Sequence, residues 1–201
     1  MKSKISVLKN SLSGDFLDGK FDNGRYSTDA SIYQIMPEAV ILPKNIEDIK
    51  KTIQFSQEYN IPILPRGGGT SQNGQTINRA IVLDNSKYLN KIIEVDAINQ
   101  TCLVEPGVVL DELNRFLKPY GLWFPVDVST SSRATIGGMA GNNSAGGRSI
   151  RYGIMRDNVI SIDTLLSDAS EAHFGLSKKN ISGLQSLLPK LMAIAEKNKN
   201  E

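Results

Sequence analysis

The sequence reads Pro65-Arg66-Gly67-Gly68-Gly69-Thr70-Ser71-Gln72-Asn73-Gly74-Gln75 directly after a short apolar run, Ile61-Pro62-Ile63-Leu64. Three consecutive glycines are costly to order, because glycine loses more backbone entropy on folding than any other residue. Successive N–H groups in such a turn form a concavity that binds anions. We therefore interpret residues 65–75, called the glycine loop below, as a phosphate cradle in which Arg66 adds a charge and Thr70 and Ser71 add donors. The alternative is a surface loop without a ligand.

Single positions exclude two common phosphate-binding loops. The dinucleotide fingerprint G-x-G-x-x-G, begun at Gly67, needs a third glycine where this chain has Gln72. The stretch from Gly69 to Thr76 lacks the lysine of a P-loop, because Gln75 stands where that lysine would reach the terminal phosphates. The glycine loop therefore belongs to another class of nucleotide-binding loop.

The composition is that of an ordinary globular protein, with 40% hydrophobic and 22% charged residues and a net charge of +2. Scattered basic residues without interleaved aromatics give nucleic-acid binding little support. With one cysteine, Cys102, and one histidine, His173, an internal disulfide is excluded and a His/Cys metal site has almost no basis. We find no signal peptide and no apolar stretch of about 18 residues. The expected location is cytoplasmic, with any membrane contact made through partners.

Strands and helices flank the glycine loop in the order strand, helix, strand, loop, strand. Three isoleucines recur at helical spacing after Asn45, a good N-cap, so we predict an amphipathic helix over residues 45–59. Residues 1–35 are mixed and polar, which predicts a short helix and an extended arm. Apolar runs predict three strands, at 38–42, 61–64 and 80–84.

Patterns in the second half of the chain predict further strands, two helices and an unreactive thiol. A helix face formed by three leucines and Tyr120 closes at Gly121. Near the end, an apolar helical stripe is interrupted by Pro189, which should start a helix or kink one. Cys102 lies in a predicted strand, so we expect it to be buried and unreactive. Strands are predicted at 91–95, 101–105, 159–166 and 171–174. The apolar stripe consists of Leu184, Leu187, Leu188, Leu191, Met192 and Ala195.

Residues 125–148 form a second region rich in glycine and hydroxyl side chains, called the second loop below. Such a long stretch with little periodicity is uncommon in a compact domain unless it binds something. Together the two loops suggest one extended ligand between two small lobes, with Asp127 accepting from a hydroxyl or an amine. The alternative is that these side chains cap their own loop. The candidate ligand contacts are Ser129, Ser132, Thr135, Gly137, Gly138 and Asn142.

Five motifs in this order resemble those of the FAD-linked oxidases with the vanillyl-alcohol oxidase, or PCMH-type, FAD-binding fold. The branch they resemble contains the D-lactate, glycolate and D-2-hydroxyglutarate dehydrogenases. The resemblance covers residues from about 25 to 169. The motifs are Arg25-Tyr26-Ser27-Thr28-Asp29-Ala30-Ser31, the glycine loop, Val104-Glu105-Pro106-Gly107, Ala134-Thr135-Ile136-Gly137-Gly138-Met139-Ala140-Gly141-Asn142-Asn143 and Arg151-Tyr152-Gly153.

The resemblance implies an α+β fold of two subdomains with FAD between them and its pyrophosphate on the glycine loop. It divides the chain into an N-terminal arm (1–35), a first FAD-binding subdomain (36–88) and a second, truncated one (89–201). Some relatives attach FAD through a His or Cys where Thr70 and Ser71 stand here, so non-covalent binding is implied. The implied cofactor contacts are Arg66, Gly67, Gly68, Gly69, Thr70, Ser71, Gln75, Asp127, Ser132, Thr135, Gly137, Gly138 and Asn142.

The last strands and the substrate domain of this branch have no counterpart in the sequence, so we expect an amino-terminal piece of a longer enzyme. Catalytic residues are then not among those named, and the piece alone should be inactive. The parent would oxidise a D-2-hydroxy acid and pass electrons to a partner or an iron–sulfur module. The apolar stripe and an open strand edge near 159–166 predict that the piece self-associates.

Two other functions stay open on the sequence alone. One is a reductase of the enolpyruvyl-UDP-sugar type, which uses FAD with NADPH on the same fold. The other is a non-catalytic module that binds a nucleotide or a protein partner through the apolar stripe. The motif at residues 25–31 and Arg151-Tyr152-Gly153 favour the hydroxy-acid enzyme over the reductase.

Overall fold

The computed structural model describes residues 2–175 and 187–199, and their side chains from residue 7 onward. It divides into two compact units, residues 1–158 and residues 159–201, which we describe separately. The subdomain boundary expected near residue 88 stays a prediction. Leu184 of the apolar stripe lies outside the described residues.

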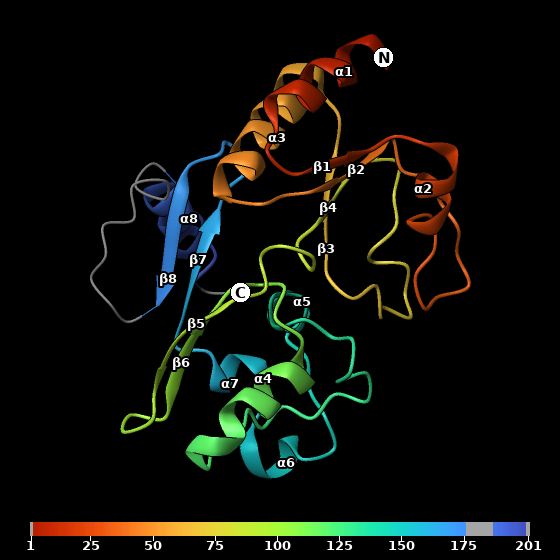
Figure 1. Cartoon of the computed structure of the whole chain (residues 1–201). Coiled ribbons are helices and arrows are strands. Elements are labelled where there is room, and N and C mark those ends of the chain that lie inside the picture. The colour runs from red at the N-terminus through yellow and green to blue at the C-terminus, as the bar shows by residue number, and fades with distance from the viewer. Residues whose placement is uncertain (1, 176–186, 200–201) are drawn as a thin grey trace. The chain divides into compact units, whose positions relative to one another are not determined.

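The first unit is built on a four-stranded sheet in the order β1-β2-β4-β3 (Figure 1). The first strand pairs antiparallel with β2, whereas β2, β4 and β3 run parallel. The two central strands are buried along their whole length and read as continuous apolar runs, as expected of a parallel sheet covered on both faces. The strands are β1 (Asp15–Leu17), β2 (Ala39–Leu42), β3 (Ile63–Arg66) and β4 (Ile81–Asp84).

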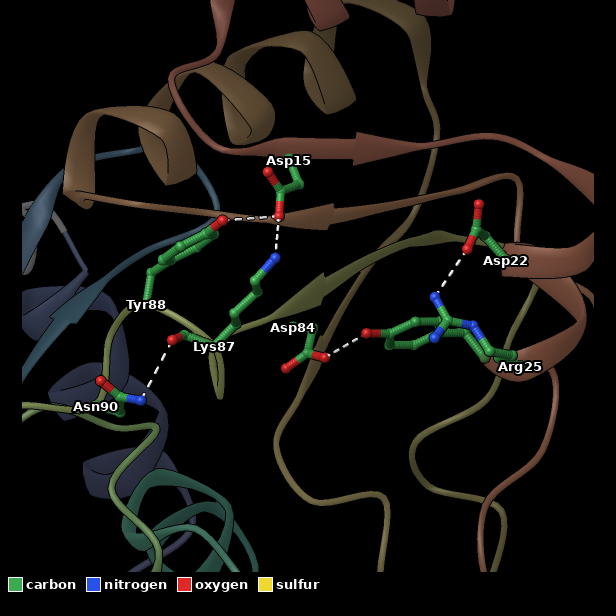
Figure 2. A network of polar contacts seen from close by, with 8 residues as sticks. Asp15, Asp22, Arg25, Asp84, Lys87, Tyr88 and Asn90 are labelled. Atoms are coloured by element: carbon green, nitrogen blue, oxygen red, sulfur yellow. Dashed lines mark hydrogen bonds and ion pairs between the residues drawn. The ribbon is translucent and has the colours of Figure 1, made fainter.

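Two findings about this sheet differ from the sequence predictions. The region expected to be an extended arm supplies β1, which is tied to the segment after β4 because Lys87 Nζ and Tyr88 Oη both donate to Asp15 Oδ2, at 2.6 and 2.9 Å (Figure 2). The third strand begins two residues later than predicted, because Asn60 takes a left-handed conformation that ends the preceding helix. As a result, β3 runs into Arg66 at the start of the glycine loop.

One face of the sheet carries α1 (Lys2–Ser11) and α3 (Ile46–Tyr59), and a short α2 (Lys20–Arg25) follows β1. The predicted cap of α3 is confirmed, since Asn45 Oδ1 accepts the N–H of Asp48 at 2.9 Å. Strand alternation sends Ala39 and Ile41 into one core and Val40 and Leu42 into another. The larger core contains Leu8, Ala39, Ile41, Phe55, Ile61, Ile81 and Leu83.

The rest of the first unit packs a helix on a hairpin. The predicted helix is confirmed as α4 (Leu110–Leu117), extended by a 3-10 turn at Lys118–Tyr120 and closed by Gly121. Cys102 is half-buried against this helix, and its burial raises the pKa of its thiol, as expected of an unreactive cysteine. The remaining elements are β5 (Ile92–Asp96), β6 (Thr101–Val104), α5 (Ile136–Gly141), α6 (Ser149–Tyr152) and α7 (Met155–Asn158).

The second loop is more ordered than the sequence predicts, since it contains α5 and ends at the N-cap of α6. The side chain of Thr135 caps α5 by accepting the N–H of Gly138 at 3.3 Å. Glycine lowers helix propensity, and three of the six residues of α5 are glycines, so propensity alone conceals this helix.

The second unit consists of an antiparallel hairpin and one helix. The hairpin pairs β7 (Ser161–Leu165) with β8 (Glu171–Gly175), and His173 lies opposite Asp163, 2.6 Å from its carboxylate. Pro189 lies in the first turn of α8 (Leu188–Lys197), which confirms that a helix starts there. Within the described residues, no helix is both long and apolar enough to cross a membrane.

Candidate functional site

The glycine loop follows β3 and carries a row of backbone N–H groups that have no partner among the described residues. Gly69 and Gly74 have positive φ angles of 64° and 72°, so the run of glycines serves a turn that other residues adopt only under strain. Within residues 2–175 and 187–199, no acceptor bonds the N–H groups of Gly68, Gly69, Thr70 or Ser71. Consecutive free N–H groups in a turn of this kind are the donors that bind a phosphate group.

The second loop lies directly against the glycine loop, next to the end of β3 (Figure 1). A Cβ atom on Gly67 would stand 2.1 Å from Thr135 Oγ1, and one on Gly68 would stand 2.2 Å from the carbonyl oxygen of Arg133. Both distances are far below van der Waals contact, so these positions have room only for glycine. The glycines therefore serve the contact between the loops as well as the turn.

Two further contacts connect regions distant in sequence at this site. Gln75 Nε2 donates to Asn142 Oδ1 at 3.1 Å, across 67 residues of sequence. Gly137 approaches Pro106 so closely that a Cβ would lie 2.5 Å from the proline Cβ, and its N–H donates to the Pro106 carbonyl at 2.8 Å. The two loops thus contact each other directly, and that an extended ligand lies between them stays a prediction. Five of the predicted residues make the contact: Gly67, Gly68, Gln75, Thr135 and Asn142.

Arg66 has partners that the sequence did not suggest. Its guanidinium donates to the carbonyl oxygens of Thr28, Thr76 and Tyr26, at 2.9, 3.0 and 3.4 Å. Burial lowers the pKa of the guanidinium, and the nearby charge of Asp84 opposes that shift. Arg66 therefore holds the backbone around the glycine loop together, and its role as a cofactor contact stays a prediction.

The other predicted residues fall into two groups. Ser71 and Asp127 bond their own surroundings: Ser71 Oγ donates to Gln75 Oε1 at 2.8 Å, and Asp127 Oδ1 accepts the N–H of Arg148 at 2.9 Å. These contacts match the alternative of self-capping loops. Ser132, Gly138 and Asn142 are exposed and so accessible to a ligand. Their role as FAD contacts stays a prediction.

A polar cluster behind the glycine loop was missed by sequence reasoning. Tyr26 Oη donates to Asp84 Oδ2 at 2.6 Å, and the Tyr26 ring lies 5.2 Å from the Arg66 guanidinium. Burial, followed by the hydrogen bond to Asp84, raises the pKa of Tyr26 well above its ordinary value. Figure 2 shows Asp84 pointing into this cluster. The one sequence signal for this cluster was the motif at residues 25–31, which contains Tyr26. It supported the family resemblance, but no structural role was predicted for it.

Candidate metal ligands are not gathered in one place in the part of the chain that the structure describes. Among those residues no group of three or more His, Cys, Asp or Glu side chains could hold a metal ion. Cys102 lies in β6 and His173 in β8, so neither belongs to the glycine loop or the second loop.

Replacing Arg66 with alanine is expected to weaken FAD binding about tenfold, because three backbone carbonyls lose a charged donor and the loop relaxes. A fluorescence titration of the purified chain with FAD measures this. Arg79→Ala is the matched control, since Arg79 is exposed and belongs to neither loop. Unchanged affinity in Arg66→Ala would mean that the glycine loop keeps its shape without the guanidinium.

The comparisons with known proteins agree with this geometry. The family model described as "FAD binding domain" matches residues 37–175. The D-2-hydroxyglutarate dehydrogenase of Pantoea ananatis is 39% identical over 156 residues, which are 76% of this chain and 15% of that protein. Glycolate oxidase subunit GlcD of Bacillus subtilis is 40% identical over 146 residues, 71% of this chain and 31% of the relative. The mitochondrial D-lactate dehydrogenase [cytochrome] of Kluyveromyces lactis is 37% identical over 160 residues, which are 78% of this chain and 27% of that protein.

Solved structures share the fold at low sequence identity. An alkyldihydroxyacetonephosphate synthase matches with a TM-score of 0.76 at 23% identity, over 92% of this chain and 36% of that chain. A 6-hydroxy-D-nicotine oxidase from Arthrobacter nicotinovorans matches with a TM-score of 0.72 at 18% identity, over 82% of this chain and 36% of that chain. This likeness confirms the predicted α+β architecture of the PCMH type.

Proposed function

This chain belongs to the family of FAD-binding domains, and from that premise we propose that it holds the FAD of an enzyme oxidising a D-2-hydroxy acid to the 2-oxo acid. The observation that carries the proposal is the row of free N–H groups from Gly68 to Ser71 beside the second loop. When bound, FAD accepts the hydride from the carbon that bears the substrate hydroxyl.

The residues of the site fit a dinucleotide cofactor. The free N–H groups and the Thr70 hydroxyl suit the oxygens of a pyrophosphate, whose negative charge such donors favour. Exposed polar groups of the second loop, among them Ser132 and Asn142, would serve the rest of the cofactor. Binding is non-covalent, because neither loop contains a cysteine or histidine.

The substrate class rests on the relatives, whose names specify 2-hydroxyglutarate, glycolate and lactate. The chain spans 15% of the hydroxyglutarate dehydrogenase and 31% of the glycolate oxidase subunit, so the activity of the whole protein is itself part of the proposal. The same holds for a cytoplasmic location, the two FAD-binding subdomains (36–88 and 89–201) and an iron–sulfur or other electron-transfer partner. Exposed apolar side chains on α8, such as Met192 at 68%, support self-association.

The proposal is tested by adding FAD to the purified protein and recording its visible spectrum after gel filtration. We expect flavin absorbance to travel with the protein and to be released on denaturation. The FAD-loaded protein is then mixed without oxygen with D-lactate, glycolate or D-2-hydroxyglutarate, and loss of the flavin absorbance is followed.

Each result has a distinct meaning. Bleaching by one of the three acids supports the hydroxy-acid enzyme and identifies its substrate. Bleaching by NADPH alone would support the enolpyruvyl-UDP-sugar type of reductase instead. A protein that binds FAD but is bleached by none of these compounds supports FAD binding by this chain and agrees with the expectation that the piece alone is inactive. A colourless protein that cannot be loaded with FAD would leave only the non-catalytic module.

A further inference from the structure

We infer that residues 26–33 act as a clamp that holds both ends of the glycine loop, and that the hydrogen bonds between Asp29 and Thr76 position its free N–H groups. Asp29 and Thr76 are thus positioning residues, since they act through the loop and are not placed on the cofactor. The expected effect of the clamp on FAD binding rests on the proposed function. Its expected effect on the glycine loop rests on the contacts alone.

The clamp contacts the beginning of the loop through backbone carbonyls. Arg66, the last residue of β3, donates to the carbonyl oxygens of Tyr26 and Thr28. Its own side chain also fills the space beside the loop, since a Cβ on Gly69 would stand 2.5 Å from Arg66 Nη2. The first turn of the loop is therefore packed on a guanidinium whose orientation depends on residues 26–28.

The clamp contacts the end of the loop through two side chains. Asp29 Oδ2 accepts the hydroxyl of Thr76 at 3.0 Å and its backbone N–H at 3.4 Å. Tyr33 packs on Gly74 so closely that a Cβ there would lie 2.9 Å from the tyrosine ring. The same guanidinium that holds the first turn also donates to the Thr76 carbonyl, so the two ends of the loop are joined.

The clamp is itself internally bonded, which it must be to hold another segment. Asp29 Oδ1 accepts the N–H of Ser31 at 2.9 Å, and the Ser31 hydroxyl accepts the N–H of Tyr33 at 3.2 Å. A bridge pairs Thr28 with Gln34. Both oxygens of Asp29 are therefore in use, one inside the clamp and one on the loop, and the hydrogen bonds from Ser31 and Thr76 lower the pKa of its carboxyl group against the effect of burial.

Thr76→Val tests the clamp, because valine keeps the shape of threonine and removes the hydroxyl that Asp29 accepts. We expect FAD to bind about tenfold more weakly, since a hydrogen bond to a charged group is lost and the loop gains freedom. Thr76→Ser restores the hydroxyl and should restore affinity to within about twofold. Hydrogen exchange of the free chain should be faster at residues 73–76, where the amides of Asn73, Gln75 and Thr76 are hydrogen-bonded, in Thr76→Val and unchanged in β4.

Two controls separate positioning from general destabilisation. Thr164→Val removes a hydroxyl that donates to a backbone carbonyl, Ala172 O at 3.2 Å, in the unit that does not contain the loops. It should leave FAD affinity and loop exchange unchanged. Asp29→Asn is the second variant of the clamp. Its amide has only one acceptor oxygen, whereas the two oxygens of Asp29 accept three hydrogen bonds, so it too should weaken binding.

The outcomes distinguish the clamp from the proposed function. Tight FAD binding by the parent chain and by Thr76→Val alike would overturn the clamp and leave the function standing. Equal losses in Thr76→Ser and Thr76→Val would also overturn it. If the parent chain binds no FAD, the proposed function fails, and hydrogen exchange in Thr76→Val tests the clamp: unchanged rates at residues 73–76 overturn it and faster rates support it.

Discussion

The Gly68→Val variant is expected to lose FAD binding, with affinity at least about a hundredfold weaker than that of the parent chain. A Cβ at this position would stand 2.2 Å from the Arg133 carbonyl oxygen, a backbone atom that cannot rotate away. The two loops would have to separate, and the free N–H groups that follow Gly68 would move with them. Gly69→Val should lose binding for a different reason, because its φ of 64° is strained for a β-branched residue.

The measurement is a fluorescence titration with FAD, accompanied by circular dichroism to show that each variant is folded. Gly24→Val is the matched control, since Gly24 lies in α2, has no positive φ, and a Cβ there would meet nothing within 4 Å. It should bind FAD like the parent chain. Folded Gly68→Val with full affinity would show that the glycine loop does not cradle the cofactor.

The Ile81→Ala variant is expected to lose about 3–4 kcal/mol of the free energy of unfolding. Ile81 is fully buried in β4, which pairs with β2 on one side and β3 on the other, so neighbouring strands leave little room for the site to collapse. Removing its outer carbons leaves a cavity in the larger core of the first unit.

Urea unfolding followed by circular dichroism measures this loss. Ile98→Ala provides the same chemical change at a side chain that is 93% exposed, and it should alter the free energy of unfolding by no more than about 0.5 kcal/mol. Equal effects of the two substitutions would contradict the position of β4 at the centre of the sheet.

Local signals in the sequence were sufficient to predict most of the strands and the longer helices. The cap at Asn45 and the isoleucine spacing predicted α3 to within one residue, because both signals are local: the cap directly precedes the helix and the isoleucines lie inside it. The helix α5 was missed because its glycines conceal it and its cap, Thr135, matters only where the loops meet. The strand β1 was missed because three residues with mixed polarity carry too little pattern.

The sequence alone determined that three adjacent glycines must serve an unusual turn, since their entropy cost is a property of the residues themselves. Only the tertiary structure shows why two of these glycines, Gly67 and Gly68, leave no room for a larger residue. The atoms that fill that space belong to Arg133 and Thr135, which strand order and loop packing bring beside Gly67 and Gly68. The tertiary structure likewise decided that Arg66 donates to backbone carbonyls of the clamp, because these partners lie some 40 residues away in the sequence.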